Sequence, residues 1–277
     1  MTGAEQTAGS TPPPARASAA WDPDTYLHFA DERSRPFADL VARVRSPSPR
    51  TVVDLGCGEG ALTASLAGRW AGARVVGVDS SPEMLGAAAA HAQHGRVSFE
   101  QGDVRTWRPD GPVDVLISNA VLHWVPGHAD LLAGWAGLLS PGGEMAVQVP
   151  GNFRAPTHAL LTEICRSPRW SAQLAAVAPH PDTVLEPAGY LDVLTAAGLS
   201  ADVWEATYLH VLRGPDPVLT WVSGTVLRPV LGELDPGEAE DLTAAYAALL
   251  KAAYPPRPDG TTVLPFRRVF AVGRRPA

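Results

Sequence analysis

The chain has 277 residues, of which 45% are hydrophobic, and a formal net charge of −7. This length and composition suffice for a large hydrophobic core, which excludes intrinsic disorder, collagen and coiled coil for most of the chain. No apolar run approaches the ~18 residues that a membrane-spanning helix needs, and the negative charge argues against a general nucleic-acid binder. The N-terminus has no basic segment followed by an apolar one, so we expect no secretion signal.

The cysteine and lysine contents argue against two further kinds of chemistry, a disulfide framework and catalysis through a lysine Schiff base. Cys57 and Cys165 are too few for a disulfide framework, so a reducing, cytoplasmic location is expected. Arginine accounts for every basic residue except Lys251, which nearly excludes lysine Schiff-base chemistry. An anion site in this chain must therefore use arginine, which can hold a carboxylate through two parallel hydrogen bonds.

The chain divides by composition into a tail and one folded domain. Residues 1–20 are rich in Pro, Gly, Ser and Ala and are predicted to be a disordered tail. A helix is expected to begin near Trp21 and to end before the two prolines of residues 46–49. Residues 21–150 are interpreted as this helix and a cofactor-binding core. Residues 151–277 are expected to complete the sheet and to add a helical, substrate-binding cap to the same domain.

From residue 51 onward, short β-rich runs alternate with helical stretches. The first predicted strands cover residues 51–55, 74–78, 97–100, 113–117 and 144–149, and the helices between them cover residues 61–70, 82–91 and 130–139. This alternation predicts an α/β fold with a doubly wound parallel sheet. Later come a segment without a clear strand, a helix, two more β-like runs and a helical insert expected to fold over the sheet, at residues 151–187, 189–197, 202–212, 266–273 and 216–256.

A glycine-rich turn follows the first predicted strand and leads directly into a helix. Gly56, Gly58 and Gly60 allow the backbone to turn tightly and to approach a ligand closely. The run from Gly56 to Ala61 also satisfies G-x-G-x-x-A, the dinucleotide fingerprint, so an NAD-dependent oxidoreductase is one hypothesis. No lysine or arginine for a diphosphate lies nearby, which disfavours a phosphate cradle.

Three acidic residues lie at the ends of successive strands. Asp54 precedes the glycines, Asp79 ends the second strand and Asp103 ends the third. Each could separately be a helix cap or a turn residue. An NAD site gives a role to Asp79, through the ribose, but none to the other two. A ligand with a cationic amino-acid moiety, a ribose diol and an exocyclic amine would use all three, and S-adenosylmethionine is such a ligand.

The run 54–60, with Asp79, Asp103 and the predicted loop 139–143, resembles the class I S-adenosylmethionine-dependent methyltransferases. A closer resemblance covers nearly the whole chain from Trp21 and is to the trans-aconitate 2-methyltransferase family. The segments that carry it are residues 21–23, 26–29, 33–36, 119, 123–126, 148–150 and 227–229.

The resemblance implies a mostly parallel, seven-stranded Rossmann-like sheet with a helical cap. It also implies transfer of the methyl group of S-adenosylmethionine to a carboxylate oxygen of trans-aconitate, giving a monomethyl ester and S-adenosylhomocysteine. The cofactor contacts that it implies run from the methionyl part through the ribose and adenine to the methyl group, and comprise Asp54, Gly56, Gly58, Asp79, Ser80, Met84, Asp103, Val104, Asn119 and Ala120.

A trianionic substrate needs cations, particularly on a protein of charge −7. The arginine candidates are Arg33, Arg35, Arg154 and Arg228, each of which could instead form an ordinary salt bridge. The aromatic residues that could wall the substrate site, or simply pack in the core, are Tyr26, Phe29, His123, Trp124 and Trp221. No metal site is expected.

No proton-transfer residue is expected, because a carboxylate with a pKa near ~4 is already ionised at neutral pH. Alignment of the reacting atoms and exclusion of water would supply the catalysis. Alternatives are another small carboxylic acid, a secondary-metabolite hydroxyl with His123 as its base, and a protein that senses S-adenosylmethionine without turnover. The expected partner is a small polycarboxylate, with no nucleic acid and no membrane, and the expected state is a monomer or a weak homo-oligomer.

Overall fold

The computed structural model describes the backbone of residues 30–277 and the side chains from Ser34 onward. The predicted tail, the predicted start of the first helix at Trp21, and the substrate candidates Tyr26 and Phe29 lie outside the described residues. Arg33 lies in helix α2, Ala30–Ala42, but its side chain is outside them too.

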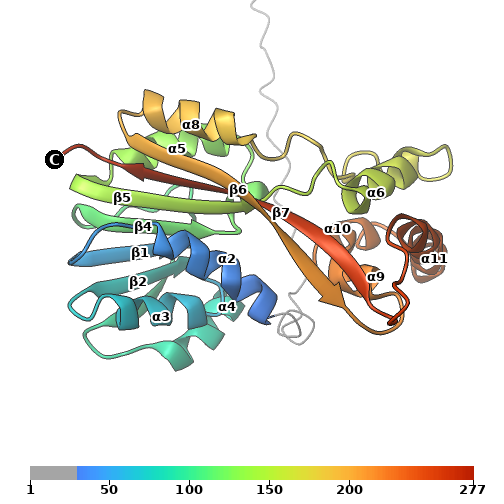
Figure 1. The fold of residues 1–277 in the computed structure, drawn as a ribbon, viewed down its shortest axis with the longest axis horizontal. Helices are drawn as coiled ribbons and strands as arrows, with labels where there is room; N and C mark the ends of the chain where they lie inside the picture. Colours follow the sequence, from blue (N-terminus) through green and yellow to red (C-terminus); the bar gives the residue numbers. More distant parts are fainter. Residues whose placement is uncertain (1–29) are drawn as a thin grey trace, which may run out of the picture.

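Seven strands form one sheet in the order β3-β2-β1-β4-β5-β7-β6 (Figure 1). The first five are parallel, and β7 runs antiparallel to both of its neighbours. The strand order reverses between β1 and β4, which is where open α/β sheets bind their ligands. The doubly wound, mostly parallel sheet is thereby confirmed, with strands β1 Thr51–Leu55, β2 Arg74–Asp79, β3 Val97–Gln101, β4 Val113–Asn119, β5 Leu139–Pro150, β6 Ser200–Leu212 and β7 Thr262–Arg274.

The helices follow the predicted alternation. Helices α6 and α7 lie within residues 151–187, for which the sequence analysis predicted no strand and named no helix. Two short 3-10 helices, η1 Ala89–His91 and η2 Leu122–Trp124, also occur. No helix between residues 30 and 277 combines the length and apolarity needed to cross a bilayer. The α-helices after α2 are α3 Ala61–Arg69, α4 Pro82–Ala88, α5 His128–Ala136, α6 Pro156–Arg166, α7 Ser171–Leu174, α8 Pro187–Ala196, α9 Pro217–Ser223, α10 Leu227–Leu231 and α11 Pro236–Ala253.

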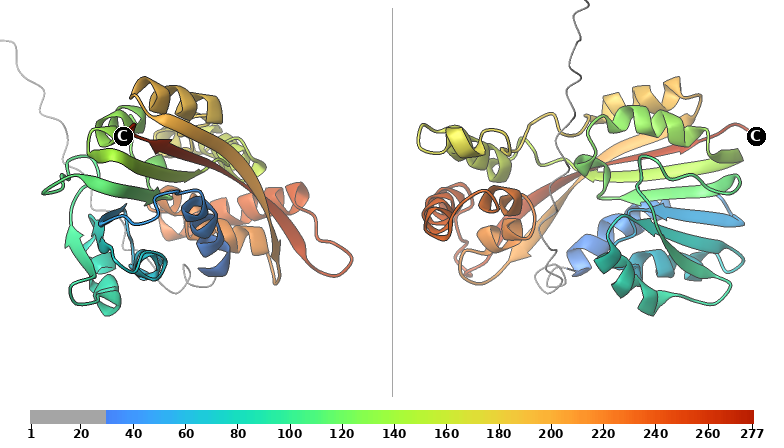
Figure 2. Two further views of the ribbon diagram at one scale, coloured as in Figure 1. Left: turned by 60° about the vertical axis from the view of Figure 1, so that its left-hand side comes forward. Right: turned by 180° about the vertical axis from the view of Figure 1, so that it is seen from behind.

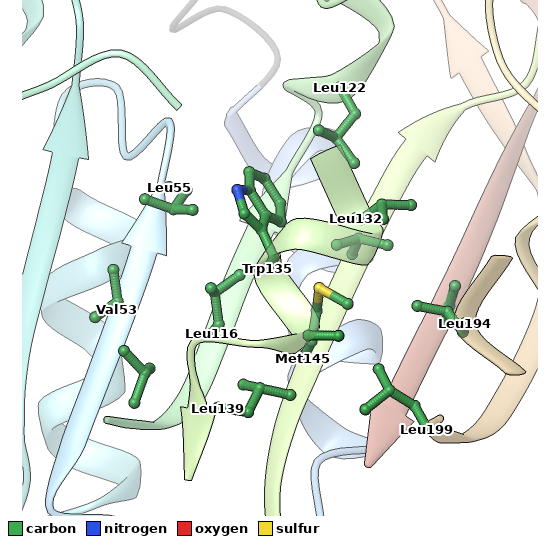
Figure 3. Packing of buried hydrophobic residues seen from close by; sticks show 14 of the residues in the cluster. Val53, Leu55, Leu116, Leu122, Leu132, Trp135, Leu139, Met145, Leu194 and Leu199 are labelled. Carbon is green, nitrogen blue, oxygen red and sulfur yellow. The ribbon is translucent and has the colours of Figure 1, made fainter. Parts of the chain in front are cut away.

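The sheet is covered on both faces, so its inner strands are apolar on both sides. Helices α2 and α3 pack on one face, where Phe37 and Leu66 belong to the same buried cluster as Phe270. Helices α5 and α8 pack on the other face. There Figure 3 shows Trp135 of α5 beside Leu116 of β4, within a fully apolar cluster.

The structure corrects the predicted beginning of the fifth strand. The expected loop at residues 139–143 is part of β5, which begins at Leu139. The pairing with β4 shifts register between Val113 and Val115, and Gly142 has a φ of +75°. An irregularity of this kind lets Pro and Gly lie inside an extended strand, which a sequence pattern cannot distinguish from a loop.

Strands β6 and β7 form a long ribbon that leaves the sheet. Strand β5 ends where Pro150 pairs with Arg268, whereas residues 262–267 continue to pair with residues 207–212 of β6. The ribbon therefore extends ~20 Å past the carboxyl ends of the parallel strands.

The cap gathers around the end of this ribbon. Helices α6, α9, α10 and α11 are grouped there in both views (Figures 1 and 2). The insert at 216–256 was expected to fold over the sheet, and it covers only the extended ends of β6 and β7. Its apolar residues, including Leu227 and Leu242, pack with Leu161 of α6 into a cluster that also contains Leu212 of β6 and Leu264 of β7.

Candidate functional site

The glycine turn after β1 crosses the end of β2. The backbone N–H groups of Gly56 and Cys57 donate to the Val78 carbonyl at 2.7 and 3.0 Å. The N–H of Gly58 donates to Oδ2 of Asp79 at 2.9 Å. These bonds place the turn and the acid of β2 side by side at the carboxyl edge of the sheet.

Each glycine of the turn has a positive φ, and their surroundings differ. A Cβ on Gly56 would lie 2.2 Å from Val121 Cγ2, and one on Gly60 would lie 2.6 Å from Phe99. A Cβ on Gly58 would meet no atom of the described residues within 4 Å, and the φ of Gly58 is +56°. Gly56 and Gly60 thus permit close packing within the protein, whereas Gly58 leaves its backbone open to approach by a ligand.

Two backbone N–H groups hold the Asp79 carboxylate in place, and both of its oxygens can accept further hydrogen bonds. Its Oδ2 accepts from Gly58, and its Oδ1 accepts from the backbone N–H of Ser81 at 2.9 Å. Because each carboxylate oxygen has two lone pairs, both can still accept from a diol. Ser80 is exposed and Met84 is half-buried at the start of α4, next to this carboxylate in the chain.

Asp54 is buried beneath the turn, and Thr63 of α3 donates its hydroxyl to Oδ2 at 2.6 Å. Burial raises the pKa of Asp54 to about 6, the Thr63 hydrogen bond opposes the rise, and the charge of Asp79 adds to it. A bound cationic group would favour the ionised carboxylate and lower this pKa again. The residue therefore suits a ligand that carries an ammonium group.

Asp103 is engaged by its neighbour Arg105. The backbone N–H and the Nε of Arg105 each donate to Oδ1 at 2.9 Å, and this hydrogen bonding holds the pKa of Asp103 below its usual range. An adenine amine would share this carboxylate with Arg105. Val104 is anchored next to it, because the indole N–H of Trp135 donates to its carbonyl at 3.3 Å.

The end of β4 carries two signs of a ligand-facing position. The side-chain oxygen of Asn119 is buried and accepts no hydrogen bond from the described residues. Ala120 has a φ of +57°, held by a hydrogen bond from its N–H to the Gln148 carbonyl at 2.9 Å. Buried polar atoms are rarely left unpaired and left-handed backbone is costly outside glycine, so both features indicate a functional region.

These residues fit S-adenosylmethionine. The open backbone at Gly58 and the unpaired oxygen of Asn119 lie on either side of the point where the strand order reverses. The acids supply acceptors for an ammonium, a diol and an amine. Among residues 30–277, no three His, Cys, Asp or Glu side chains gather in a way that could hold a metal ion.

The predicted aromatic residues after β4 lie beside this region. The Nδ1 atom of His123 is enclosed and has no hydrogen-bond partner among the residues that the structure describes, although part of the residue is exposed. Burial, with the positive charge of Arg268 as the next cause, lowers the pKa of His123 to about 3. The ring lies 4.6 Å from that of Trp124, which is 54% exposed, and 6.3 Å from Phe153.

The predicted arginines are dispersed. Arg154 is exposed and paired with Asp182. Arg228 is half-buried in α10 of the cap. Arg35 is exposed on α2, and its guanidinium lies 5.1 Å from the centre of the Tyr208 ring. Their role toward a substrate stays a prediction.

Sequence reasoning missed the most deeply buried arginine near the site. Arg268 of β7 is 5% exposed, and its Nη1 donates to Oε1 of Gln148 at 3.3 Å. Across the ribbon, His210 is also buried, with its ring stacked 4.5 Å from Trp221.

The sequence did hold a signal for Arg268. Strand side chains alternate between faces, and this arginine interrupts an apolar row that faces one way, namely Leu264, Phe266 and Phe270. A charged residue at an inward position of a strand is a functional candidate. Gln148 entered the sequence analysis only as part of a resembling segment.

Comparisons with known proteins agree with this arrangement. A family model described as a methyltransferase domain matches residues 52–143. The trans-aconitate 2-methyltransferase of Streptomyces avermitilis is 53% identical over 94% of this chain and 99% of its own length. That of Mycolicibacterium gilvum is 49% identical over 92% of this chain and 98% of its own. The crystal structure of YcgJ from Bacillus subtilis has the same fold, with a TM-score of 0.58 at 14% identity over 88% of this chain and 99% of that one.

Proposed function

The chain belongs to the trans-aconitate 2-methyltransferase family, and from this premise we propose that it methylates a carboxylate of trans-aconitate. It is an S-adenosylmethionine-dependent methyltransferase, and the products would be the monomethyl ester and S-adenosylhomocysteine. The substrate assignment rests on the high sequence identity to relatives of that name, which extends along nearly the whole chain and includes the cap.

When bound, S-adenosylmethionine supplies a methyl group on a cationic sulfur, so that a C–O bond forms as the C–S bond breaks, the electron pair stays on sulfur and no proton moves. The chain's own task is to bind, align and exclude water. We assign the cofactor to the turn and strand ends described above, namely Asp54, Gly56, Gly58, Asp79, Ser80, Met84, Asp103, Val104, Asn119 and Ala120.

The state of His123 supports a carboxylate acceptor over a hydroxyl. A hydroxyl would need a general base, and an effective base has a pKa near the working pH. With a pKa of about 3, His123 is a weak base, and its ring is neutral at pH 7. A carboxylate is already ionised and requires no base, so we propose no proton-transfer residue.

We assign the substrate to residues of the cap and of the loops next to the cofactor region. His123, Trp124, Arg154 and Arg228 are its described members, and Tyr26, Phe29 and Arg33 are proposed from the sequence. We further propose one methyltransferase domain over residues 21–277, acting as a monomer or weak homo-oligomer with no nucleic-acid or membrane partner. Cys57 and Cys165, both buried and free, support a cytoplasmic location.

The test is transfer of labelled methyl groups to a panel of small acids: trans-aconitate, cis-aconitate, citrate and isopropylmalate. Mild base releases the label from an ester and not from an ether. We expect base-labile product, greatest with trans-aconitate. Cofactor binding without transfer to any acid of the panel would overturn the substrate assignment and leave the methyltransferase fold in place.

A further inference from the structure

We propose that Arg268 and Gln148 together hold a carboxylate of the substrate other than the one that is methylated, and so select polycarboxylates. The inference rests on the proposed function and deepens it, because it names residues that recognise the substrate class. It concerns strands β5 and β7, which the sequence analysis did not connect to the substrate.

The sheet register places this pair beside the cofactor region. Asn119 at the end of β4 pairs with Gln148 of β5, and Gln148 pairs with Phe270 of β7. Arg268 lies two residues from Phe270 on the same strand, so its side chain points to the same face. The side chains of Asn119, Gln148 and Arg268 therefore form one row across three adjacent strands, at the carboxyl edge where the methyl group would be presented.

The pair offers hydrogen-bond donors to an anion. Gln148 is 1% exposed, and its Oε1 accepts from Arg268, which fixes the orientation of the amide because a guanidinium only donates. The Nε2 of Gln148 is then directed elsewhere, and this buried donor has no hydrogen-bond partner among the described residues. A guanidinium and an adjacent free amide N–H match the two oxygens of a carboxylate.

The surrounding rings carry no negative charge. The Nδ1 of His123 and the Nε2 of His210 are both buried, and neither has a hydrogen-bond partner in the part of the chain that the structure describes. For both rings burial lowers the pKa, and the positive charge of Arg268 lowers it further, which places this guanidinium within electrostatic reach of both. A neutral imidazole can donate one N–H, so in the appropriate tautomer each ring can add a donor beside Arg268 and Gln148.

Burial explains why this pair would select between substrates. A charged group held away from water gains much more from an ionised partner than an exposed one does. An analogue that lacks the carboxylate forfeits a charge-assisted hydrogen bond in the protein interior, and such sites reject the truncated ligand strongly. The exposed Arg154, which water also solvates, offers far less discrimination.

The test uses two site variants and one matched control in the full-length chain. Arg268→Met removes the guanidinium. Gln148→Glu keeps the side-chain size and places a carboxylate against Arg268, so that a negative charge occupies the position assigned to the free amide donor. Arg267→Met is the control, because Arg267 is the next residue of β7, faces the other way and bonds to Glu205 at 2.9 Å.

Kinetics would be measured with trans-aconitate and with two analogues that each lack one carboxylate, mesaconate and glutaconate. We expect Arg268→Met and Gln148→Glu to raise KM for trans-aconitate about 10- to 100-fold, the loss typical of a hydrogen bond to a charged group. The preference for three carboxylates over two should fall by a similar factor. In both site variants the affinity for S-adenosylmethionine, which also reports folding, should change less than about threefold. Arg267→Met should change neither KM for trans-aconitate nor the preference for three carboxylates.

A binding measurement separates this inference from the proposed function. Tricarballylate, a saturated tricarboxylate, would be titrated into each variant loaded with S-adenosylhomocysteine. Binding by the parent chain that is lost in both site variants supports the pair even when trans-aconitate is not methylated. Site variants that bind cofactor and keep the parent's KM, preference and tricarballylate affinity would overturn the inference and leave the proposed function standing. If Arg268→Met fails to fold, Gln148→Glu alone decides.

Discussion

The cofactor side and the proposed substrate side of the site are assembled in different ways. On the cofactor side, the residues lie at or just beyond the carboxyl ends of parallel strands, since Asp54 lies within β1, Gly56 follows β1 and Asp79 ends β2. On the substrate side, His123 follows β4, Gln148 lies in β5 and Arg268 lies in β7, so these residues come together only because β4, β5 and β7 are neighbours in the sheet. A short motif can specify the first arrangement, whereas the second depends on the order of strands in the completed sheet.

The two sides also carry opposite charge. Asp54, Asp79 and Asp103 face the region assigned to a cofactor that bears an ammonium group and a sulfonium. Arg268 and the neutral ring of His123 face the region assigned to a polyanion. The separation lets a protein of net charge −7 bind both a cation and an anion at one edge of its sheet. The predictions below test each side in turn.

The largest effect is expected from Gly56→Ala on the cofactor side. The added methyl group would lie 2.2 Å from Val121 Cγ2, and the φ of +83° is unfavourable for alanine. Overpacking and left-handed strain together should lower the free energy of unfolding by about 2–5 kcal/mol. Chemical denaturation would measure the loss, and calorimetry should show that cofactor binding is lost with it.

Gly142→Ala is the matched control for that variant. Gly142 also has a positive φ, +75°, but no atom of the described part of the chain lies within 4 Å of the added methyl group. The cost should be limited to the backbone strain, about 1–2 kcal/mol, with unchanged cofactor affinity. Equal losses in the two variants would show that the contact with Val121 does not matter.

Asp54→Asn, also on the cofactor side, should have opposite effects on the stability of the protein and on its affinity for the cofactor. A pKa raised from 3.8 to about 6 corresponds to about 3 kcal/mol. The native protein holds this proton more tightly than the unfolded chain does. The stability that the protonated group contributes below about pH 4 is therefore lost as the pH rises through 6. The stability of Asp54→Asn relative to the parent should thus increase by about 2–3 kcal/mol between pH 4 and pH 7.

Cofactor binding by Asp54→Asn should change in the other direction. Loss of the carboxylate should weaken S-adenosylmethionine binding about 10- to 100-fold at pH 7.5, as expected for a hydrogen bond to a charged group. In the parent chain the affinity should fall as the pH drops below 6. Calorimetric titrations at several pH values would measure both. A variant that binds as well as the parent would remove Asp54 from the cofactor site.

A moderate effect is expected from His123→Gln on the substrate side. If His123 only contacts the substrate, kcat should fall less than about tenfold, whereas removal of a general base typically costs ~10²–10⁴-fold. At saturating cofactor the rate should also be independent of pH between 7 and 9, which lies above the pKa of about 6 for Asp54. A larger loss with a sloping pH profile would favour a hydroxyl acceptor.

The smallest effect is expected from Arg154→Met. This side chain is 65% exposed and paired with Asp182, and exposed ion pairs contribute only about 0–1 kcal/mol. KM for trans-aconitate should rise no more than about fivefold. A rise that exceeds that of Arg268→Met would transfer the main substrate contact from the ribbon to the loop after β5.

Much of the fold could be predicted from the sequence because it depends on local patterns. The strands β1 to β4 and the helices α3 and α8 lie close to their predicted ranges, since apolar runs and helical periodicity are properties of short segments. The predicted bounds were less accurate for elements whose conformation depends on tertiary contacts. Helix α6 is buried against α11 of the cap. At the start of β5, only Leu139 pairs with β4, and Gly142 and Gly143 form backbone hydrogen bonds with residues 275–276 near the C-terminus.

The candidate site also combines residues that local sequence patterns predict with residues that only the tertiary structure brings together. The sequence by itself determined the glycine turn and the three acids, because a strand followed by a tight turn places its next side chains at the carboxyl edge of a parallel sheet whatever the rest of the chain does. Only the tertiary structure decided that β7 would lie between β5 and β6, that the cap would gather at the end of the ribbon, and that Arg268 would meet Gln148. These contacts join residues more than a hundred positions apart, and such pairings are set by the burial of the whole sheet rather than by any local pattern.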